Sequence, residues 1–449
     1  MDTQNIKNPT SMSAATDRQI VLVPVSDLKP HPRNARKHSR AQIKAIAKSI
    51  DTFGFNAPVL ADKDGNILAG HGRIEAAKLL GLSQVSVVFL HHLTDAEAKA
   101  YMLADNKLTD RSSWDDTTLA IQLKELSELA LSFDIDATGF ELPEIDLRIQ
   151  SLEVAESLDA DDFRLADDQP VSVMGDIWHL GDHRILCGNA LDHAALSGLF
   201  GDEKAAAAFT DPPYNVKIDG HVGGKGTVRH REFPMATGEM SEDEFAAFLT
   251  SALSGICRHS APGALIYTCM DWRHMSETLA AARSSGCELL NLCVWVKSNG
   301  GMGSLYRSRH ELVFVFRNGP EPHLNNIQLG RFGRNRQNVW NYAGGNAFAR
   351  KGSKRNLELH PTVKPVLMVA DAIQDSTKRN DIVFDPFLGS GTTLLAAERV
   401  GRRCYGIELD PLYVDTAVER WQRMTGRKAH SHLGESFEFL KSRRSAVNE

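Results

Sequence analysis

The tetrapeptide Asp211-Pro212-Pro213-Tyr214 combines an acid, a rigid turn and an aromatic ring. The apolar run 205–209 before it predicts a buried strand, which places the tetrapeptide where α/β sheets bind ligands. The prolines lack N–H donors, so nearby carbonyls are left as acceptors. The Asp211 carboxylate and the Pro212 carbonyl can accept both hydrogens of an amino group while Tyr214 stacks on a planar ring. The alternative is a proline-rich turn with a capping acid.

A second motif, DPFLGSGTT, occupies residues 385–393 between an apolar run and a predicted helix. Strand, glycine turn and helix form the usual geometry of a nucleotide-type cofactor site. Gly389 and Gly391 allow the backbone to approach a ligand closely, and Thr392 beside them is predicted to contact the same cofactor. Asp385 is suited to an ammonium group, such as that of a methionine moiety. The motif is not a P-loop, because no lysine precedes the threonines, and the dinucleotide fingerprint lacks its third glycine.

An acid follows the glycine turn at the spacing that ribose recognition needs. Glu408 ends the next predicted strand, about twenty residues after the turn, where a carboxylate binds ribose hydroxyls. The alternative for Glu408 taken alone is a surface acid at a strand end. Its spacing from the turn favours the functional interpretation.

Cysteine spacing and composition exclude several classes of protein. None of the six cysteines forms a C-x-x-C pair, so we expect no metal site and no disulfide framework, and free thiols fit a reducing cytoplasm. No apolar run approaches the ~18 residues that a membrane span needs, so we expect no membrane partner. The net charge of −6 excludes a uniformly basic protein but leaves local nucleic-acid-binding patches open.

Three motifs together resemble the amino-group DNA methyltransferases. They are residues 211–214, residues 387–391 beginning at Phe387, and the HPTVKP segment 360–365. The catalytic motif precedes the cofactor motif, as in the permuted beta group of that family. The resemblance implies a Rossmann-like fold, S-adenosyl-L-methionine as cofactor and Lys364 near the cofactor carboxylate. Asp rather than Ser at position 211 resembles the N6-adenine enzymes, and N4-cytosine methylation is the alternative.

Two segments between these motifs are predicted to contact double-stranded DNA. Residues 219–238 are rich in Gly and His, and residues 317–358 interleave basic residues with Trp340, Tyr342 and Phe348. Such a mixture suits phosphate contacts and base readout, and the family keeps its target-recognition region here. The alternative is a solvated basic loop. The predicted DNA-contacting residues are Arg229, Arg231, Arg331, Arg334, Arg336, Lys351 and Arg355.

The first 110 residues resemble the ParB-like domain. The resemblance rests on the segment Asn34-Ala35-Arg36 and on the segment 70–73, which reads GHGR where ParB proteins have GERR. ParB proteins contact nucleotide phosphates with the second segment. Because His71 and Gly72 replace two of its residues, nucleotide hydrolysis is not expected. Arg36 and Arg73 could bind phosphate or DNA, and a structural accessory role is the alternative.

The elements that must position these motifs predict two α/β units. Apolar runs at 206–210, 265–268, 293–296, 312–316 and 382–385 alternate with helical stretches, which predicts a doubly wound, mostly parallel sheet. A small α/β unit precedes it, with a helix that begins after Ser39 and a hairpin turn at Asp64-Gly65. The predicted divisions are a disordered leader 1–17, a ParB-like domain 18–110, a helical connector and acidic linker 111–170, a methyltransferase domain 171–440 and a tail 441–449.

Two other functions remain as rivals. Methylation of RNA or protein by the same fold is disfavoured by the basic aromatic segment and by the permuted order of the motifs. A partition-type DNA-binding protein with a degenerate methyltransferase domain is disfavoured because residues 211–214 and 385–393 are intact. The recognition sequence, a cognate nuclease and the oligomeric state, a homodimer included, are left open.

Overall fold

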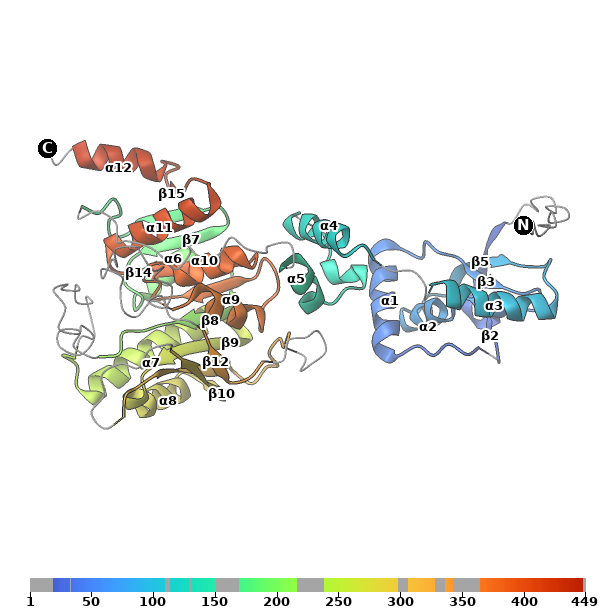
Figure 1. Ribbon diagram of the computed structural model, residues 1–449, viewed down its shortest axis with the longest axis horizontal. Helices are drawn as coiled ribbons and strands as arrows, with labels where there is room; N and C mark the ends of the chain where they lie inside the picture. The colour runs from blue at the N-terminus through green and yellow to red at the C-terminus, as the bar shows by residue number, and fades with distance from the viewer. Residues whose placement is uncertain are drawn as a thin grey trace, which may run out of the picture. The chain divides into compact units, whose positions relative to one another are not determined.

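Two compact units, Met1–Leu152 and Glu153–Glu449, make up the chain. The computed structural model describes residues 19–32, 34–109, 114–129, 131–150, 169–215, 238–297, 306–327, 336–342 and 364–446 (Figure 1). Among these residues, no helix is both long and apolar enough to cross a membrane. The predicted leader 1–17 lies outside the described residues.

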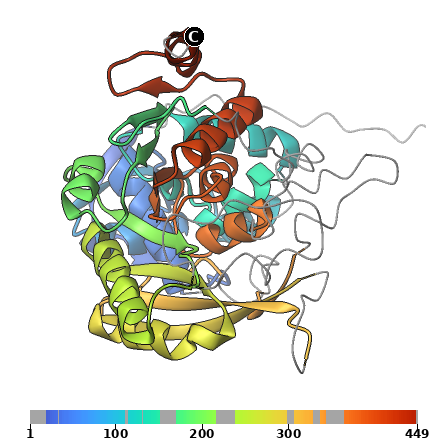
Figure 2. The same ribbon diagram turned by 90° about the vertical axis from the view of Figure 1, so that its left-hand side faces the viewer.

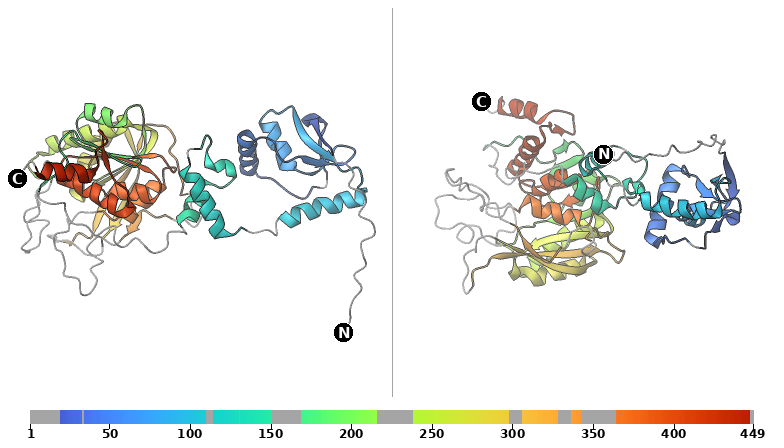
Figure 3. Two further views of the ribbon diagram at one scale, coloured as in Figure 1. Left: turned by 90° about the horizontal axis from the view of Figure 1, so that it is seen from above. Right: turned by 45° about the vertical axis from the view of Figure 1, so that its right-hand side comes forward.

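The first unit is built on a five-stranded sheet in the order β1-β5-β3-β4-β2. Its elements are β1 (Ile20–Pro24), η1 (Val25–Asp27), β2 (Lys29–Pro30), α1 (Arg40–Phe53), β3 (Val59–Ala61), β4 (Asn66–Ala69), α2 (His71–Leu79), β5 (Gln84–Phe89) and α3 (Asp95–Thr109). The Ser39 hydroxyl caps α1 by accepting from the Gln42 N–H, and β3 pairs antiparallel with β4. The predicted helix start and the hairpin are therefore confirmed. Figure 3 shows this unit, blue to cyan, from two further sides.

The segment that was predicted as a connector packs with the first unit. It forms α4 (Asp116–Glu128), η2 (Ile135–Thr138) and α5 (Leu142–Gln150), which share a small apolar core. Lys48 of α1 forms ion pairs with Asp134 at 3.1 Å and with Asp136 at 2.5 Å. The part of the predicted connector up to residue 150 is thus an extension of the first unit. The acidic linker that follows lies outside the described residues up to residue 168.

A ten-stranded sheet forms the second unit, in the order β12-β10-β11-β9-β8-β13-β14-β7-β6-β15. The strands are β6 (Ile177–Leu180), β7 (His183–Cys187), β8 (Ala205–Thr210), β9 (Ser260–Met270), β10 (Cys287–Val296), β11 (His310–Asn318), β12 (Val339–Asn341), β13 (Ile382–Asp385), β14 (Arg403–Glu408) and β15 (His430–Ser431). The central run β9-β8-β13-β14-β7 is parallel, as predicted. β11 runs antiparallel to both of its neighbours, which the sequence did not predict.

Two helical layers cover this sheet, and each has its own apolar core. On one face lie α9 (Val366–Gln374), α10 (Thr392–Arg399) and α11 (Pro411–Thr425). On the other lie α6 (His193–Phe200), α7 (Glu242–His259) and α8 (Met275–Ser284). Figure 2 shows α7 and α8 in yellow-green and α10 and α11 in orange to red, on opposite sides of the sheet. The chain therefore has the predicted doubly wound, Rossmann-like α/β architecture.

The C-terminal end of the chain is helical beyond the predicted domain boundary. α12 (Phe437–Ala446) continues through most of the segment predicted as a tail. The Phe437 ring packs edge-on against Trp178 at 5.2 Å, and Arg444 pairs with Asp176 at 3.0 Å. An aromatic contact and an ion pair hold this helix to β6 and to the turn before it.

Candidate active site

The sheet reverses its winding direction between β8 and β13. These parallel neighbours pair at Val383–Ala207 and Phe384–Ala208, while the chain proceeds from β8 to β9 on one side and from β13 to β14 on the other. Ligands of open α/β sheets bind outside the carboxyl ends of the strands at such a point. The Asp211 turn follows β8 directly and Asp385 ends β13. The two motifs that the sequence analysis singled out therefore lie side by side.

The turn after β13 needs glycine for two separate reasons. Gly389 and Gly391 have φ values of +54° and +88°, in the left-handed region that side chains disfavour. A Cβ atom on Gly391 would also lie 2.7 Å from the Cβ of Ala417 on α11. The turn is thus packed tightly under α11, and α10 begins with Thr392 immediately after it.

Asp385, the last residue of β13, is buried directly before this turn. Its carboxylate accepts from the Thr393 hydroxyl at 2.6 Å and from the Phe387 N–H at 3.1 Å. Burial raises the pKa of Asp385 to about 7. The Phe387 ring lies 5.8 Å from that of Phe248 on α7, so Phe387 anchors the turn to the opposite helical layer.

Glu408 holds the same turn from the end of β14. Its two carboxylate oxygens accept from the Gly389 N–H and the Asp410 N–H, each at 2.8 Å. Burial raises the pKa of Glu408 to about 7 as well. Within the described residues, no basic side chain pairs with Asp385 or Glu408. Two desolvated acids without a cation suit a ligand that brings an ammonium group and hydroxyl donors.

Beside the glycine turn, Asp211 belongs to a cluster of charged groups. The Lys364 ammonium lies 2.5 Å from Asp211 Oδ2 and 2.7 Å from Glu311 Oε1. The Tyr214 hydroxyl lies 2.6 Å from Asp211 Oδ1 and 2.6 Å from Glu311 Oε1. Lys297, just after β10, holds the other oxygen of Glu311 at 2.6 Å. The residues come from four distant parts of the chain and meet where the two parallel strands end.

The Tyr214 hydroxyl lies equally close to both carboxylates, but the surroundings shift the pKa values of the two acids in opposite directions. A phenol has one hydrogen and can donate it to only one of two neighbouring carboxylates. Burial raises the pKa of Asp211 against the attraction of Lys364. Burial also acts to raise the pKa of Glu311, but Lys364 and Lys297 outweigh it and lower that pKa to about 2. The two lysines thus favour the charged form of Glu311, whereas burial disfavours the charged form of Asp211.

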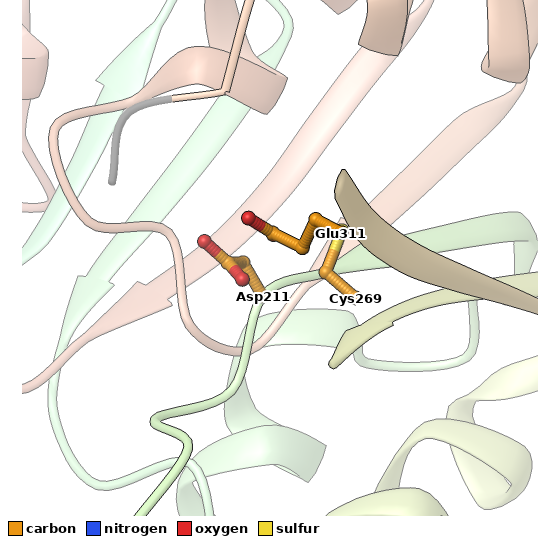
Figure 4. Close-up of side chains that lie close together, drawn as sticks. All are labelled: Asp211, Cys269 and Glu311. Carbon is orange, nitrogen blue, oxygen red and sulfur yellow. The ribbon is translucent and has the colours of Figure 1, made fainter. Parts of the chain in front are cut away.

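The Cys269 thiol on β9 completes a group of three metal-ligating side chains with Asp211 and Glu311. Figure 4 shows the carboxylates of Asp211 and Glu311 facing each other beside this cysteine. The Lys364 ammonium is within 2.7 Å of both carboxylates, so the cluster already contains a cation. Burial also keeps the pKa of the Cys269 thiol well above its usual range, which disfavours the thiolate that a metal would require.

Arg336, one of the predicted DNA contacts, has partners within the second unit. Its guanidinium pairs with Asp371 at 2.9 Å and with Asp375 at 3.0 Å, and it stacks over Trp340 at 5.7 Å. The side chain is only 18% exposed. Arg336 thus ties the segment around β12 to α9, and its role as a DNA contact stays a prediction. The other predicted DNA contacts, Arg229, Arg231, Arg331, Arg334, Lys351 and Arg355, lie outside the described residues.

In the first unit, the ParB-like motif residues surround a pocket. Arg36, His38, His71, Arg73 and Asn106 contribute to its wall. Arg73 folds back over Gly70, where an added Cβ would lie 2.9 Å from the guanidinium, and burial lowers the pKa of His71. The two arginines that the sequence analysis paired therefore do share one site.

Comparison with known proteins agrees with this geometry. A DNA methylase family model matches residues 205–419, and a ParB N-terminal domain model matches residues 10–107. The chain belongs to the DNA amino-methyltransferase family and carries an N-terminal ParB-like domain. The family resemblance inferred from the motifs is confirmed.

Relatives of this DNA methylase cover its two parts separately. The ParB-like nuclease domain-containing protein YnaK of Escherichia coli is 44% identical over 79 residues, which are 18% of this chain and 91% of YnaK. The type II methyltransferase M.HpaI of Haemophilus parainfluenzae is 26% identical over 253 residues, 53% of this chain and 74% of M.HpaI. A putative DNA modification methylase of Thermus thermophilus, solved with S-adenosyl-L-methionine, is 21% identical with a TM-score of 0.39, covering 54% of this chain and 93% of that one.

The sequence analysis missed part of the methylase's charged cluster. Glu311 and Lys297 belong to no motif, and only their apolar surroundings in β10 and β11 hinted at buried positions. The resemblance implied that Lys364 lies near a cofactor carboxylate, and in the structure its ammonium forms ion pairs with Asp211 and Glu311. The signal in the sequence was a glutamate directly before the apolar run 312–316, because a charged residue within a buried strand needs a partner.

Proposed function

We propose that this DNA methylase transfers a methyl group from S-adenosyl-L-methionine to N6 of adenine in double-stranded DNA. The observation that carries the proposal is the position of Asp211 and Tyr214 beside the Asp385–Gly391 turn, at the point where the sheet reverses its winding. Asp rather than Ser at position 211 favours adenine over cytosine within the family.

The residues of the second turn fit the proposed cofactor. Asp385 would hold the ammonium group of the methionine part, and Glu408 would receive ribose hydroxyls. When bound, S-adenosyl-L-methionine supplies a methyl group made electrophilic by a positively charged sulfur. The raised pKa values of both acids support this assignment, because a cationic ligand compensates the cost of burying their charge.

The residues of the first turn would receive the target base. A base inside a duplex is not accessible at its amino nitrogen, so it must leave the stack first. Asp211 and the Pro212 carbonyl would then accept the amino hydrogens, and the Tyr214 ring would stack on the base. Holding the nitrogen in this way lowers the barrier through proximity and orientation. Ionised Asp211 is the better acceptor, so the proposed reaction favours the deprotonated carboxyl.

One experiment tests the reaction and the base together. The purified protein is incubated with methyl-labelled S-adenosyl-L-methionine and duplex DNA, and the DNA is then digested to nucleosides for mass spectrometry. We expect label in N6-methyladenine. Label in N4-methylcytosine would correct the base while keeping the reaction class. Label in RNA or protein but not in DNA would overturn the proposal.

A further inference from the structure

The ion-pair cluster raises a problem for the proposed reaction, since both carboxyl oxygens of Asp211 are already engaged. Lys364 lies 2.5 Å from Oδ2 and the Tyr214 hydroxyl lies 2.6 Å from Oδ1. An incoming amino group must exchange with one of these partners before Asp211 can accept its hydrogen. Lys364 cannot simply be released, because an unpaired buried ammonium is costly.

Glu311 offers Lys364 a second place. Its Oε1 lies 2.7 Å from the Lys364 ammonium, and its side chain is buried. Side-chain exposure is 27% for Asp211 but only 4% for Lys364 and 5% for Glu311. A substrate can therefore reach Asp211 without displacing the buried Lys364–Glu311 pair. With Lys297 the four charged groups sum to zero, so the cluster has no net charge to neutralise.

The fold holds Glu311 more firmly than its partners. β11 is hydrogen-bonded on both sides, with Glu311 opposite Trp295 on β10 and Leu312 opposite Met270 on β9. Asp211 and Lys364 both lie on loops, after β8 and before α9. The rigid strand thus supplies the fixed anion, and the loops supply the groups that exchange partners.

We propose that Glu311 is a positioning residue for methyl transfer, which retains the Lys364 ammonium while Asp211 exchanges its Lys364 contact for the amino group of the target base. This inference rests on the proposed function. It assigns Glu311 a role that acts through Asp211, not on the substrate directly. Without the Glu311 charge, Lys364 loses one of its anionic partners, so its contact with Asp211 becomes harder to exchange.

The test compares Glu311→Gln with wild type in single-turnover methylation of a duplex, together with cofactor binding by calorimetry. We expect the rate to fall by about tenfold or more, because the negative charge that holds the Lys364 ammonium is lost while the shape of the side chain is kept. Cofactor affinity should stay within about twofold, because Asp385 and Glu408 lie on other strands. Glu288→Gln is the matched control: Glu288 lies on the adjacent strand β10, is 59% exposed and pairs with Arg317.

The pH profile separates positioning from simple structural support. The Glu311 charge raises the pKa of Asp211, and its removal also leaves Lys364 wholly on Asp211. Both effects lower that pKa, so the acid limb of the rate profile should move to lower pH in Glu311→Gln. A slower enzyme with an unmoved limb would overturn the inference, as would a rate within about twofold of wild type. A wild-type protein that does not methylate DNA would instead overturn the proposed function.

A second pair of variants covers the case in which Glu311→Gln does not fold. In the Lys364→Met background no ammonium can stay on Asp211, so adding Glu311→Gln should leave the rate unchanged or raise it. A further loss of about tenfold or more in the double variant would overturn the inference, because the retained cation would not explain it.

Discussion

Asp211 is the residue on which the proposed chemistry depends. Asp211→Ala removes the carboxylate acceptor and one of the two anionic partners of Lys364, but leaves the glycine turn intact. We expect methyl transfer to fall to background while S-adenosyl-L-methionine affinity stays near wild type, measured by label transfer and calorimetry. Wild-type turnover in this variant would refute the proposed active site.

Tyr214 contributes a ring and a hydroxyl, and two substitutions separate them. Tyr214→Phe keeps the ring but loses the hydrogen bonds to Asp211 and Glu311, so we expect reduced activity. Tyr214→Ala also loses a base stack worth on the order of 1–3 kcal/mol, so it should be much less active than Phe. Initial methylation rates measure both. Equal losses in the two variants would contradict the stacking role.

The cofactor acids predict a pH dependence of binding. Asp385 and Glu408 each have a pKa raised to about 7, so both are largely protonated below that value and ionised above it. Ionised Asp385 holds the ammonium group better and ionised Glu408 is the better acceptor of hydroxyl hydrogens, so S-adenosyl-L-methionine affinity should rise by about tenfold or more from about pH 6 to pH 8. Calorimetry in buffers of different ionisation enthalpy should detect proton release on binding at about pH 7. Asp385→Asn should flatten this dependence, and an equally steep profile in that variant would contradict the assignment.

At the scale of elements, the glycine turn and its helix act as one unit. Gly391→Ala combines a positive φ with a Cβ contact of 2.7 Å to Ala417, so α10 and α11 must move apart. We expect a loss of about 1–3 kcal/mol in unfolding free energy and weaker cofactor binding. Gly426→Ala is the control, because it has a φ of +70° but no neighbour within 4 Å of the added Cβ. Similar losses in both variants would show that packing under α11 is irrelevant.

Arg336 links two elements, and its removal should affect stability more than DNA binding. Arg336→Ala leaves Asp375, which is 6% exposed, without its guanidinium, and should cost about 1–3 kcal/mol in urea unfolding. The salt dependence of DNA affinity should not change. Arg334→Ala, at a predicted phosphate contact, should flatten that dependence and keep the stability. Unchanged stability together with a flatter salt dependence in Arg336→Ala would support Arg336 as a DNA contact.

At the scale of the whole molecule, the methylase motifs all lie in the second unit. A shortened chain that begins near residue 165 keeps Val171 and Ser172, whose backbone N–H groups donate to the buried Asp415 of α11. It should fold, bind S-adenosyl-L-methionine and retain some methylation, with weaker or less selective DNA binding. Calorimetry and labelled-duplex assays measure these. A folded shortened chain that binds no cofactor would mean that the first unit completes the site.

Local signals in the sequence determined much of this molecule. A strand and a proline turn at residues 205–214, and a strand–turn–helix pattern at residues 382–400, predicted both turns, because apolar runs, prolines and glycines restrict the backbone wherever they occur. The order of the motifs and their residues pointed to the family that the comparisons confirm. The Ser39 cap and the Asp64-Gly65 hairpin were equally local and equally predictable.

Only the tertiary structure decided which charges meet. Glu311 and Lys364 are distant in sequence, and the antiparallel insertion of β11 between β9 and β10 is what places Glu311 on Asp211 and Lys364. The same holds for Arg336, whose basic neighbours suggested DNA while its actual partners lie on α9 and at its C-terminal end. Periodicity reports which residues are buried, but partner choice among charged groups depends on strand order, which no local pattern encodes.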